Sequence, residues 1–439
     1  MIERFFRLTE NGTTVRKEAI AGLTTFAAMA YILAVNPSIL GLSGMDRGAV
    51  IVATAIASAI MTVVMALMTN FPIALAPGMG INAFFTFGIC LGAKIPWQAA
   101  LGLVFYSGAA FFALTVTGAR QKIIEAIPHS LKIAISCGIG LFIAFIGLKG
   151  GGLITKSDAT LVTLGPMNTP GTWLVLAGII LSSVLVLRRV RGALILGILA
   201  LTVLGLFLSG ETPGSHITSA PASLFSMPPS LTPTLFQLDL GYFWSHWRTC
   251  VPLVLALLFV DVFDNLGTLI GVCSRAGLMD SQGNLPKMGR VLTADAAAAM
   301  VGSCLGTSTV TSYIESAAGV EAGGRTGLTA IVTALGFVAA LFLSPIIAMI
   351  PAVATAPALI LVGVFMMQGI KDLDLKDFGV AVPAVVTMLA MPLTFSIAEG
   401  IALGFIVHVG CLALSGRARE ISWLGYVLGA LFVAHLWFR

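Results

Sequence analysis

Apolar segments long enough to cross a lipid bilayer follow one another along almost the whole chain. Hydrophobic residues make up 58% of the sequence and charged residues only 10%, whereas a soluble domain carries about a quarter charged residues. Inside a bilayer the backbone polar groups need partners from the protein itself, which a helix provides within one segment. The sequence therefore predicts an all-α polytopic membrane protein.

Basic residues indicate how the chain is oriented. Lys and Arg gather in short loops, and the N-terminal lead-in contains Arg4, Arg7, Arg16 and Lys17. Cytoplasmic loops carry such an excess, so we expect a cytoplasmic N-terminus in the cell membrane. The formal charge of +5 arises from these loops and does not indicate a nucleic-acid partner. Residues 1–17 lack the features of a cleavable signal, so none is expected.

The apolar segments predict about fourteen spans. Their approximate limits are 18–36, 49–68, 72–91, 99–117, 127–148, 172–187, 193–208, 251–272, 291–305, 307–320, 329–349, 352–370, 383–397 and 398–414. Pro37 is expected to end the first span, because proline cannot supply a helical N–H. The apolar run at 421–438 is long enough for a further crossing or for an interfacial helix.

The order of the spans repeats in the second half. The third span of each half is interrupted, by prolines and glycines at 72–80 and by small and polar residues at 307–320. We expect short extended segments there, covered by protein or lining a cavity. Because a repeat of seven spans is odd, the second repeat would enter the membrane inverted, as in secondary transporters. The expected divisions are a first repeat at 1–209, an external connection at 210–246, a second repeat at 247–414 and a C-terminal hydrophobic segment at 415–439.

Two segments of the second half, 258–268 and 306–320, carry three carboxylates in these apolar surroundings: Asp261, Asp264 and Glu315. A charge at the bilayer centre costs about 2.5–3.5 kcal/mol on insertion scales, so each acid needs a compensating role. Asp261 and Asp264 share one face of a helix, which we expect to border a polar cavity. Asp264 and Glu315 also lie beside helix-interrupting residues, where transporters bind solutes. Asp261 has an alternative role as a structural anchor for a neighbouring helix.

Motifs of other functional classes are missing from the sequence. It contains neither HExxH nor GxSxG, and its five histidines have no metal-ligand spacing. The six cysteines form no CxxC pair and are interpreted as small buried apolar residues. The glycine-rich stretches are too short for nucleotide loops. We therefore expect no catalytic residue, no metal site and no cofactor, and transport without ATP.

Four motifs resemble the guanine/hypoxanthine/adenine permease branch of the nucleobase–cation symporter (xanthine/uracil permease) superfamily. They are GLTTF, MAYI and VNP within 22–37, APGMGINAFF at 76–85, VDVFD and GTL within 260–269, and GTS, ES and GV within 306–320. The similarity extends over about residues 4–408. It implies fourteen spans in two inverted repeats, with a core domain of spans 1–4 and 8–11 and a gate domain of spans 5–7 and 12–14. It also implies proton-coupled purine uptake by an elevator-like mechanism, and a possible homodimer through the gate domain.

The same resemblance assigns candidate substrate-binding residues. Asp264 and Glu315 match the two carboxylates with which the family binds its substrate. Asn82 matches a polar position on the third span, and Ala83 a position whose backbone contacts the base. Thr268 occupies a position one turn beyond Asp264 where relatives vary.

A purine suits these residue types, because it has ring N–H donors and N or O acceptors around a flat apolar face. Carboxylates accept from the N–H groups, and Asn can donate and accept. Four aromatic side chains could stack on the base, although each also fits ordinary packing: Phe84, Phe85, Phe263 and Tyr313. Asn265 and Leu266 stand where close relatives have small residues, which leaves the choice among adenine, guanine, hypoxanthine and xanthine open.

The acids within the spans also bear on which ion drives transport and on which other functions are disfavoured. The protonatable groups within the spans are Asp261, Asp264, Asp295, Glu315 and Glu399. Among these, we take Asp261, Asp264 and Glu315 as the proton-coupling candidates. Sodium bound at 307–311 and uncoupled transport remain alternatives. An anion transporter of the same fold is disfavoured, because a basic residue would be expected at the binding position. A channel is disfavoured because the polar residues form an island instead of a continuous path.

Overall fold

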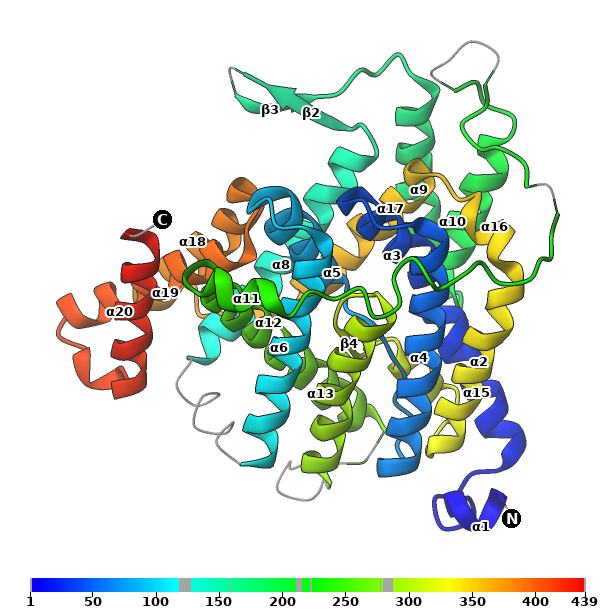
Figure 1. Cartoon of the computed structure of the whole chain (residues 1–439), viewed down its shortest axis with the longest axis horizontal. Coiled ribbons are helices and arrows are strands. Elements are labelled where there is room, and N and C mark those ends of the chain that lie inside the picture. The colour runs from blue at the N-terminus through cyan, green and yellow to red at the C-terminus, as the bar shows by residue number, and fades with distance from the viewer. Residues whose placement is uncertain are drawn as a thin grey trace.

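The computed structural model describes residues 2–117, 128–158, 160–210, 215–221, 223–276, 278 and 287–437. Helices dominate this part of the chain, and most of them run side by side (Figure 1). Eight helices among the described residues are long and apolar enough to cross a membrane. The protein is therefore a helical multi-pass membrane protein.

The elements of the first half are α1 (Ile2–Phe6), α2 (Val15–Met29), α3 (Ile32–Leu40), α4 (Arg47–Thr69), β1 (Leu75–Pro77), α5 (Met79–Ala83), the π-helix η2 (Phe84–Gly92), α6 (Trp97–Val116), α8 (His129–Gly150), β2 (Ile154–Ser157), β3 (Leu161–Leu164), α9 (Pro170–Leu187) and α10 (Ala193–Gly205). Most of these elements lie within the predicted apolar segments, whereas α1, β2 and β3 lie outside them.

The second half begins with the short helix α11. Its elements are α11 (Gly241–Ser245), α12 (Trp247–Arg275), α13 (Met288–Leu305), β4 (Val310–Ser312), α14 (Ser316–Glu321), α15 (Gly327–Ala340), α16 (Ser344–Ala348), α17 (Ala352–Met366), α18 (Phe378–Thr394), α19 (Ile397–Leu414) and α20 (Trp423–Trp437). Helix α20 packs on α19, with the rings of Phe405 and Phe432 5.6 Å apart. Whether α20 crosses the membrane or lies at its surface stays an open prediction.

The first span is interrupted earlier than predicted. The expectation that Pro37 ends it is wrong, because Pro37 lies inside α3 and the break falls at Ala30 and Tyr31. There the N–H groups of Leu33 and Ala34 bond to carbonyls three residues back, which tightens the turn. A proline ring displaces the backbone about one turn before it without ending the helix, and neighbouring elements compensate for the lost bond.

The two interrupted spans meet as a pair of short antiparallel strands. Leu75 lies opposite Ser312, Ala76 opposite Thr311 and Pro77 opposite Val310. Two further backbone bonds extend the pair, from Tyr313 N to Ala74 O and from Gly78 N to Thr309 O, each 3.0 Å long. Strand pairing satisfies the backbone groups that the missing helical turns leave free. The prediction of extended segments in both spans is confirmed.

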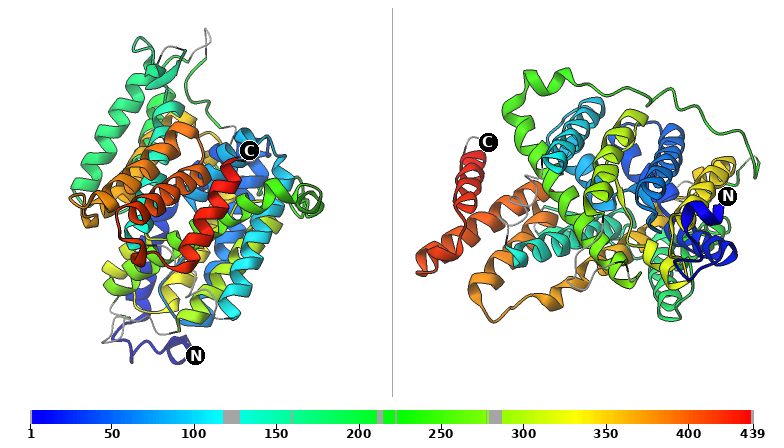
Figure 2. Two further views of the ribbon diagram at one scale, coloured as in Figure 1. Left: turned by 90° about the vertical axis from the view of Figure 1, so that its left-hand side faces the viewer. Right: turned by 90° about the horizontal axis from the view of Figure 1, so that it is seen from below.

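The helices fall into two sets by their main contacts. In one set α15 packs on α2 and α4, α13 packs on α4 and α6, and α12 packs on α6. In the other set α17 packs on α8, α9 and α10, and α18 packs on α8 and α19. Figure 2 shows α18–α20 extending to the end of the molecule opposite the N-terminus. The division into core and gate domains stays a prediction.

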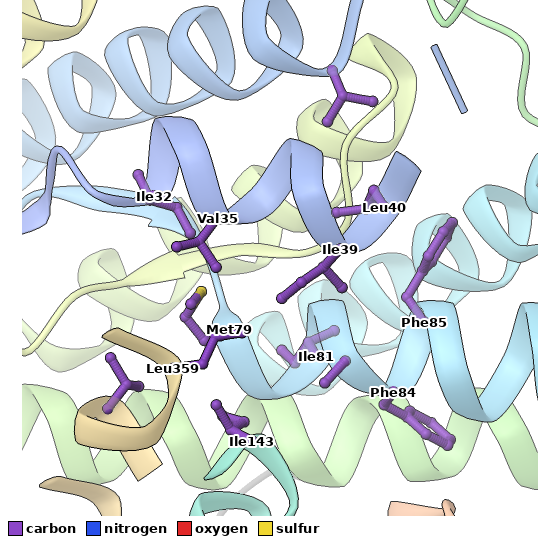
Figure 3. Close-up of a cluster of buried hydrophobic side chains, with 14 of the residues drawn as sticks. Ile32, Val35, Ile39, Leu40, Met79, Ile81, Phe84, Phe85, Ile143 and Leu359 are labelled. Carbon is purple, nitrogen blue, oxygen red and sulfur yellow. The ribbon is translucent and has the colours of Figure 1, made fainter. Parts of the chain in front are cut away.

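An apolar cluster joins the two sets. In Figure 3, Ile32, Val35 and Ile39 of α3 and Met79 and Ile81 of α5 face α8 and α17, from which Ile143 and Leu359 project. The two sets approach each other closely at Gly80, where an added Cβ would lie 2.5 Å from Cγ2 of Ile139 on α8. Only glycine lets the backbones of α5 and α8 come this near.

Candidate functional site

Glu315 lies between β4 and α14, directly before the first residue of that short helix. It is half-buried, and its Oε1 accepts a hydrogen bond of 2.6 Å from the hydroxyl of Tyr31. Tyr31 itself is buried, at the break between α2 and α3. The break in the first span therefore positions a side chain that holds the Glu315 carboxylate.

Asp264 reaches the same region from α12. It is half-buried, and a Cβ added at Gly78 would lie 3.8 Å from its Oδ2. Gly78 links β1 to α5, so Asp264 faces the backbone of the first interrupted span. The charges of Asp264 and Glu315 interact with each other. The structure thus brings together the two acids that the sequence analysis placed in one site.

Asn82 lies on α5 and is fully buried. The hydroxyl of Ser308 donates to Asn82 Oδ1, while Asn82 Nδ2 has no hydrogen-bond partner among the described residues. Asn82 is therefore connected to the polar segment before β4 and keeps an unused donor. Ala83, the last residue of α5, and Thr268, one turn beyond Asp264 on α12, are both buried. Their role as substrate contacts stays a prediction.

Asp295 is a central residue whose role the sequence analysis missed. It is fully buried on α13 and accepts from the N–H and hydroxyl of Ser312, at 2.8 and 2.9 Å, and from the hydroxyl of Thr311 at 3.3 Å. The side-chain amide of Asn265 also donates to it. Asp295 therefore ties β4 and α12 to α13. An acid in an alanine-rich helix indicated that Asp295 has a role. Its hydrogen-bond partners could not be predicted, because they are distant in the sequence.

Asp261 differs from the other acids. Its side chain is 1% exposed, and neither carboxylate oxygen has a hydrogen-bond partner. The alternative of a structural anchor predicted bonds to a neighbouring helix. The described residues provide none, so that alternative has no support in the structure.

The four aromatic candidates for stacking have different surroundings in the structure. Phe84 and Phe85 are fully buried in the apolar cluster, so they act in packing. The hydroxyl of Tyr313 donates to the carbonyl of Pro77 at 2.8 Å, which ties β1 to the chain after β4. The side chain of Phe263 lies outside the described residues.

The interpretation of the cysteines as buried apolar residues holds for four of the six. Cys90, Cys137, Cys250 and Cys273 are buried free thiols, and Cys304 and Cys411 are half-buried. His408 is buried on α19. No group of three or more His, Cys, Asp or Glu residues within the described ranges could hold a metal ion.

Comparison with known proteins identifies the family. Residues 16–403 match the sequence model of the xanthine/uracil permease family, whose description is "Permease family". The chain belongs to this family. The permease MJ0326 of Methanocaldococcus jannaschii is 50% identical over 431 residues, which cover 98% of this chain and 97% of the relative.

Two further relatives have functional names. The guanine/hypoxanthine permease PbuG of Bacillus subtilis is 44% identical and covers 100% of both chains. The adenine permease AdeP of Escherichia coli is 41% identical over 100% of this chain and 96% of the relative. The protein is therefore a transporter and not an enzyme.

Solved structures share the fold at low identity. The transmembrane domain of a cyanobacterium bicarbonate transporter, BicA, matches with a TM-score of 0.62 and 17% identity over 90% of this chain and 97% of that domain. SLC26A9 matches with the same TM-score and 14% identity over 91% of this chain and 65% of that structure. At this identity the similarity concerns the fold alone.

Proposed function

We propose that this permease imports purine nucleobases, with hypoxanthine, guanine or adenine as the substrate. The observation that carries the proposal is the meeting of Asp264 and Glu315, both half-buried, at the crossing of the interrupted spans. Two carboxylates can accept hydrogen bonds from the N–H groups of a purine. The names of PbuG and AdeP support the same substrate class.

Asn82, Ala83 and Thr268 complete the proposed purine site. The free Nδ2 of Asn82 supplies a donor for a ring nitrogen or a carbonyl oxygen, and its burial leaves little competition from water. Ala83 follows Asn82 on α5, and its backbone would contact the base. Thr268, one turn from Asp264, would influence which purine fits.

The proposed transport mechanism is elevator-like alternating access. Fourteen spans in two inverted repeats would form a core of spans 1–4 and 8–11 and a gate of spans 5–7 and 12–14. Two sets of mutually packed helices and the apolar surface between α3, α5, α8 and α17 support this arrangement. An apolar surface suits sliding, since no hydrogen bonds need to be exchanged. The gate spans would form the contact of a homodimer. The basic loops support a cytoplasmic N-terminus.

The proposed driving force is a proton gradient, with Asp261, Asp264 and Glu315 as candidate carriers. A carboxyl group that binds a proton before the loaded carrier crosses reduces the charge moved through the low-dielectric barrier. Sodium coupling and uncoupled transport are the competing outcomes. BicA shares the fold, yet two acids at the crossing point repel an anion, which disfavours anion transport here.

Uptake into proteoliposomes tests the proposal. Labelled hypoxanthine should accumulate above equilibrium under an inward proton gradient without sodium, and a protonophore should erase the accumulation. A panel of unlabelled purines should compete, and pyrimidines and bicarbonate should not. Accumulation that follows sodium and ignores the pH gradient would refute proton coupling, and equilibration under both gradients would identify a facilitator.

A further inference from the structure

We propose that Asp261, and not Asp264 or Glu315, carries the coupling proton; this rests on the purine–proton symport proposed above. The side chain is 1% exposed, and neither carboxylate oxygen accepts a hydrogen bond from the residues that the structure describes. An ionised carboxylate buried without partners is far more costly than a neutral carboxyl group. Asp261 therefore holds a proton in this conformation.

Asp295 provides the contrast within the same protein. It is equally buried, but it accepts hydrogen bonds from Ser312, Thr311 and Asn265. Charge-assisted bonds of this number stabilise a carboxylate ion. The ionisable groups that act on Asp261 are Asp295 on α13 and Asp264 on its own helix, and both are acidic. No positive side chain within the described residues forms an ion pair with Asp261 to offset a charge there.

The two remaining acids serve a different purpose. Asp264 and Glu315 are half-buried, and Glu315 already receives the hydroxyl of Tyr31. A purine that donates its N–H groups requires these carboxylates as acceptors, and a proton on either would remove an acceptor position. With the proton on Asp261, one helical turn before Asp264, both acceptors stay available.

The division of roles explains how one proton accompanies one purine. The proton passes from water to a carboxylate oxygen of Asp261 on one side of the membrane. It returns to water on the other side, when a changed packing of α12 against β4 hydrates this carboxyl group. No other bond changes. The loaded carrier crosses with Asp261 neutral, which lowers the barrier in the low-dielectric interior.

Asp261→Asn tests the inference, because asparagine imitates the neutral carboxyl group in size. In proteoliposomes this variant should bind labelled hypoxanthine and exchange it across the membrane, but it should not concentrate it under an inward proton gradient. Its exchange rate should also be independent of pH. Asp295→Asn is the matched control at an equally buried acid: it should lower the melting temperature in detergent, because asparagine offers one acceptor oxygen in place of two.

The outcomes separate this inference from the proposed function. If wild-type protein ignores the proton gradient, the symport itself is refuted. If wild-type protein is proton-driven and Asp261→Asn still concentrates hypoxanthine in a protonophore-sensitive manner, only the role of Asp261 is overturned. Should Asp261→Asn fail to fold, Asp261→Glu keeps a titratable group with a longer stem. That variant should shift the pH profile of uptake, and an unchanged profile would also overturn the inference.

Discussion

The two interrupted spans have the same backbone plan but different side chains. Each consists of a short strand followed by a helical piece, and the two strands pair with each other. The first places Met79, Ile81, Phe84 and Phe85 in an apolar cluster, with Asn82 as its main polar group. The second places hydroxyls and Glu315 in hydrogen bonds. One span is therefore mainly a packing surface, and the other supplies most of the polar chemistry.

The two interrupted spans also differ in the groups that bond to the outer edge of each strand. On β1, Leu75 gives its N–H to Thr62 Oγ1 at 2.9 Å, and its carbonyl accepts from the same hydroxyl at 3.2 Å. On β4, Ser312 lies opposite Leu75 and gives its N–H to Asp295. Thr62 and Asp295 lie on α4 and α13, the helices that precede each interrupted span. A strand edge within a membrane protein needs such a partner, and the two halves meet this need with a neutral and a charged group.

The largest expected effect comes from removing the charged partner. Asp295→Ala leaves the donors of Ser312, Thr311 and Asn265 unpaired, at about 1–3 kcal/mol for each buried group. Thr62→Val leaves only the strand edge at Leu75 unpaired and should destabilise the protein less. Thermal unfolding in detergent compares the two variants. Equal shifts in melting temperature would show that Asp295 stabilises the protein no more than Thr62 does.

The next effect concerns the acids at the crossing. Asp264→Asn and Glu315→Gln should each abolish saturable purine uptake while the protein still reaches the membrane. The loss of hydrogen bonds to a charged group costs about 1.5–3 kcal/mol, or roughly ten- to a hundredfold in affinity. Binding of labelled hypoxanthine to the purified variants measures this. Wild-type affinity in either variant would remove that acid from the site.

A smaller effect is expected from the polar residue of the first span. Asn82→Ala should weaken purine binding by roughly two- to tenfold, the value of one neutral hydrogen bond, or change the order of preference among purines. The melting temperature should fall little, because within the described part of the chain the Asn82 side chain has one hydrogen bond, from Ser308. Competition binding with adenine, guanine, hypoxanthine and xanthine is the measurement. Unchanged affinity for all four would exclude Asn82.

The smallest expected effect is on hypoxanthine affinity, and it should differ between Tyr31 and Tyr313. Tyr31→Phe removes the donor to Glu315 and should reduce hypoxanthine affinity by about threefold, since the carboxylate remains but is held less firmly. Tyr313→Phe removes the bond to the Pro77 carbonyl and should act on stability instead of affinity. Binding and unfolding measured on both variants test this. An affinity loss with Tyr313→Phe alone would assign the substrate contact to Tyr313.

Local sequence features were sufficient to predict much of this protein. Long apolar runs predicted the helices, because a helix satisfies its own backbone within one segment. Prolines and glycines at 72–80 and hydroxyl residues at 307–320 predicted the two interruptions, and the motifs around Asp264 and Glu315 predicted the family. Each of these features depends on neighbours within a few turns of the chain.

Tertiary structure decided which distant groups meet. The bond from Tyr31 to Glu315 joins residues 284 positions apart, and the bond from Ser308 to Asn82 joins residues 226 positions apart. The break at Ala30 and Tyr31, instead of at Pro37, likewise depends on the surrounding packing. Among the described residues, Asp295 has four donors and Asp261 has none, which distinguishes two acids that look alike in the sequence. Helical periodicity describes one face of one helix, whereas hydrogen-bond satisfaction depends on which helices and strands pack against that face.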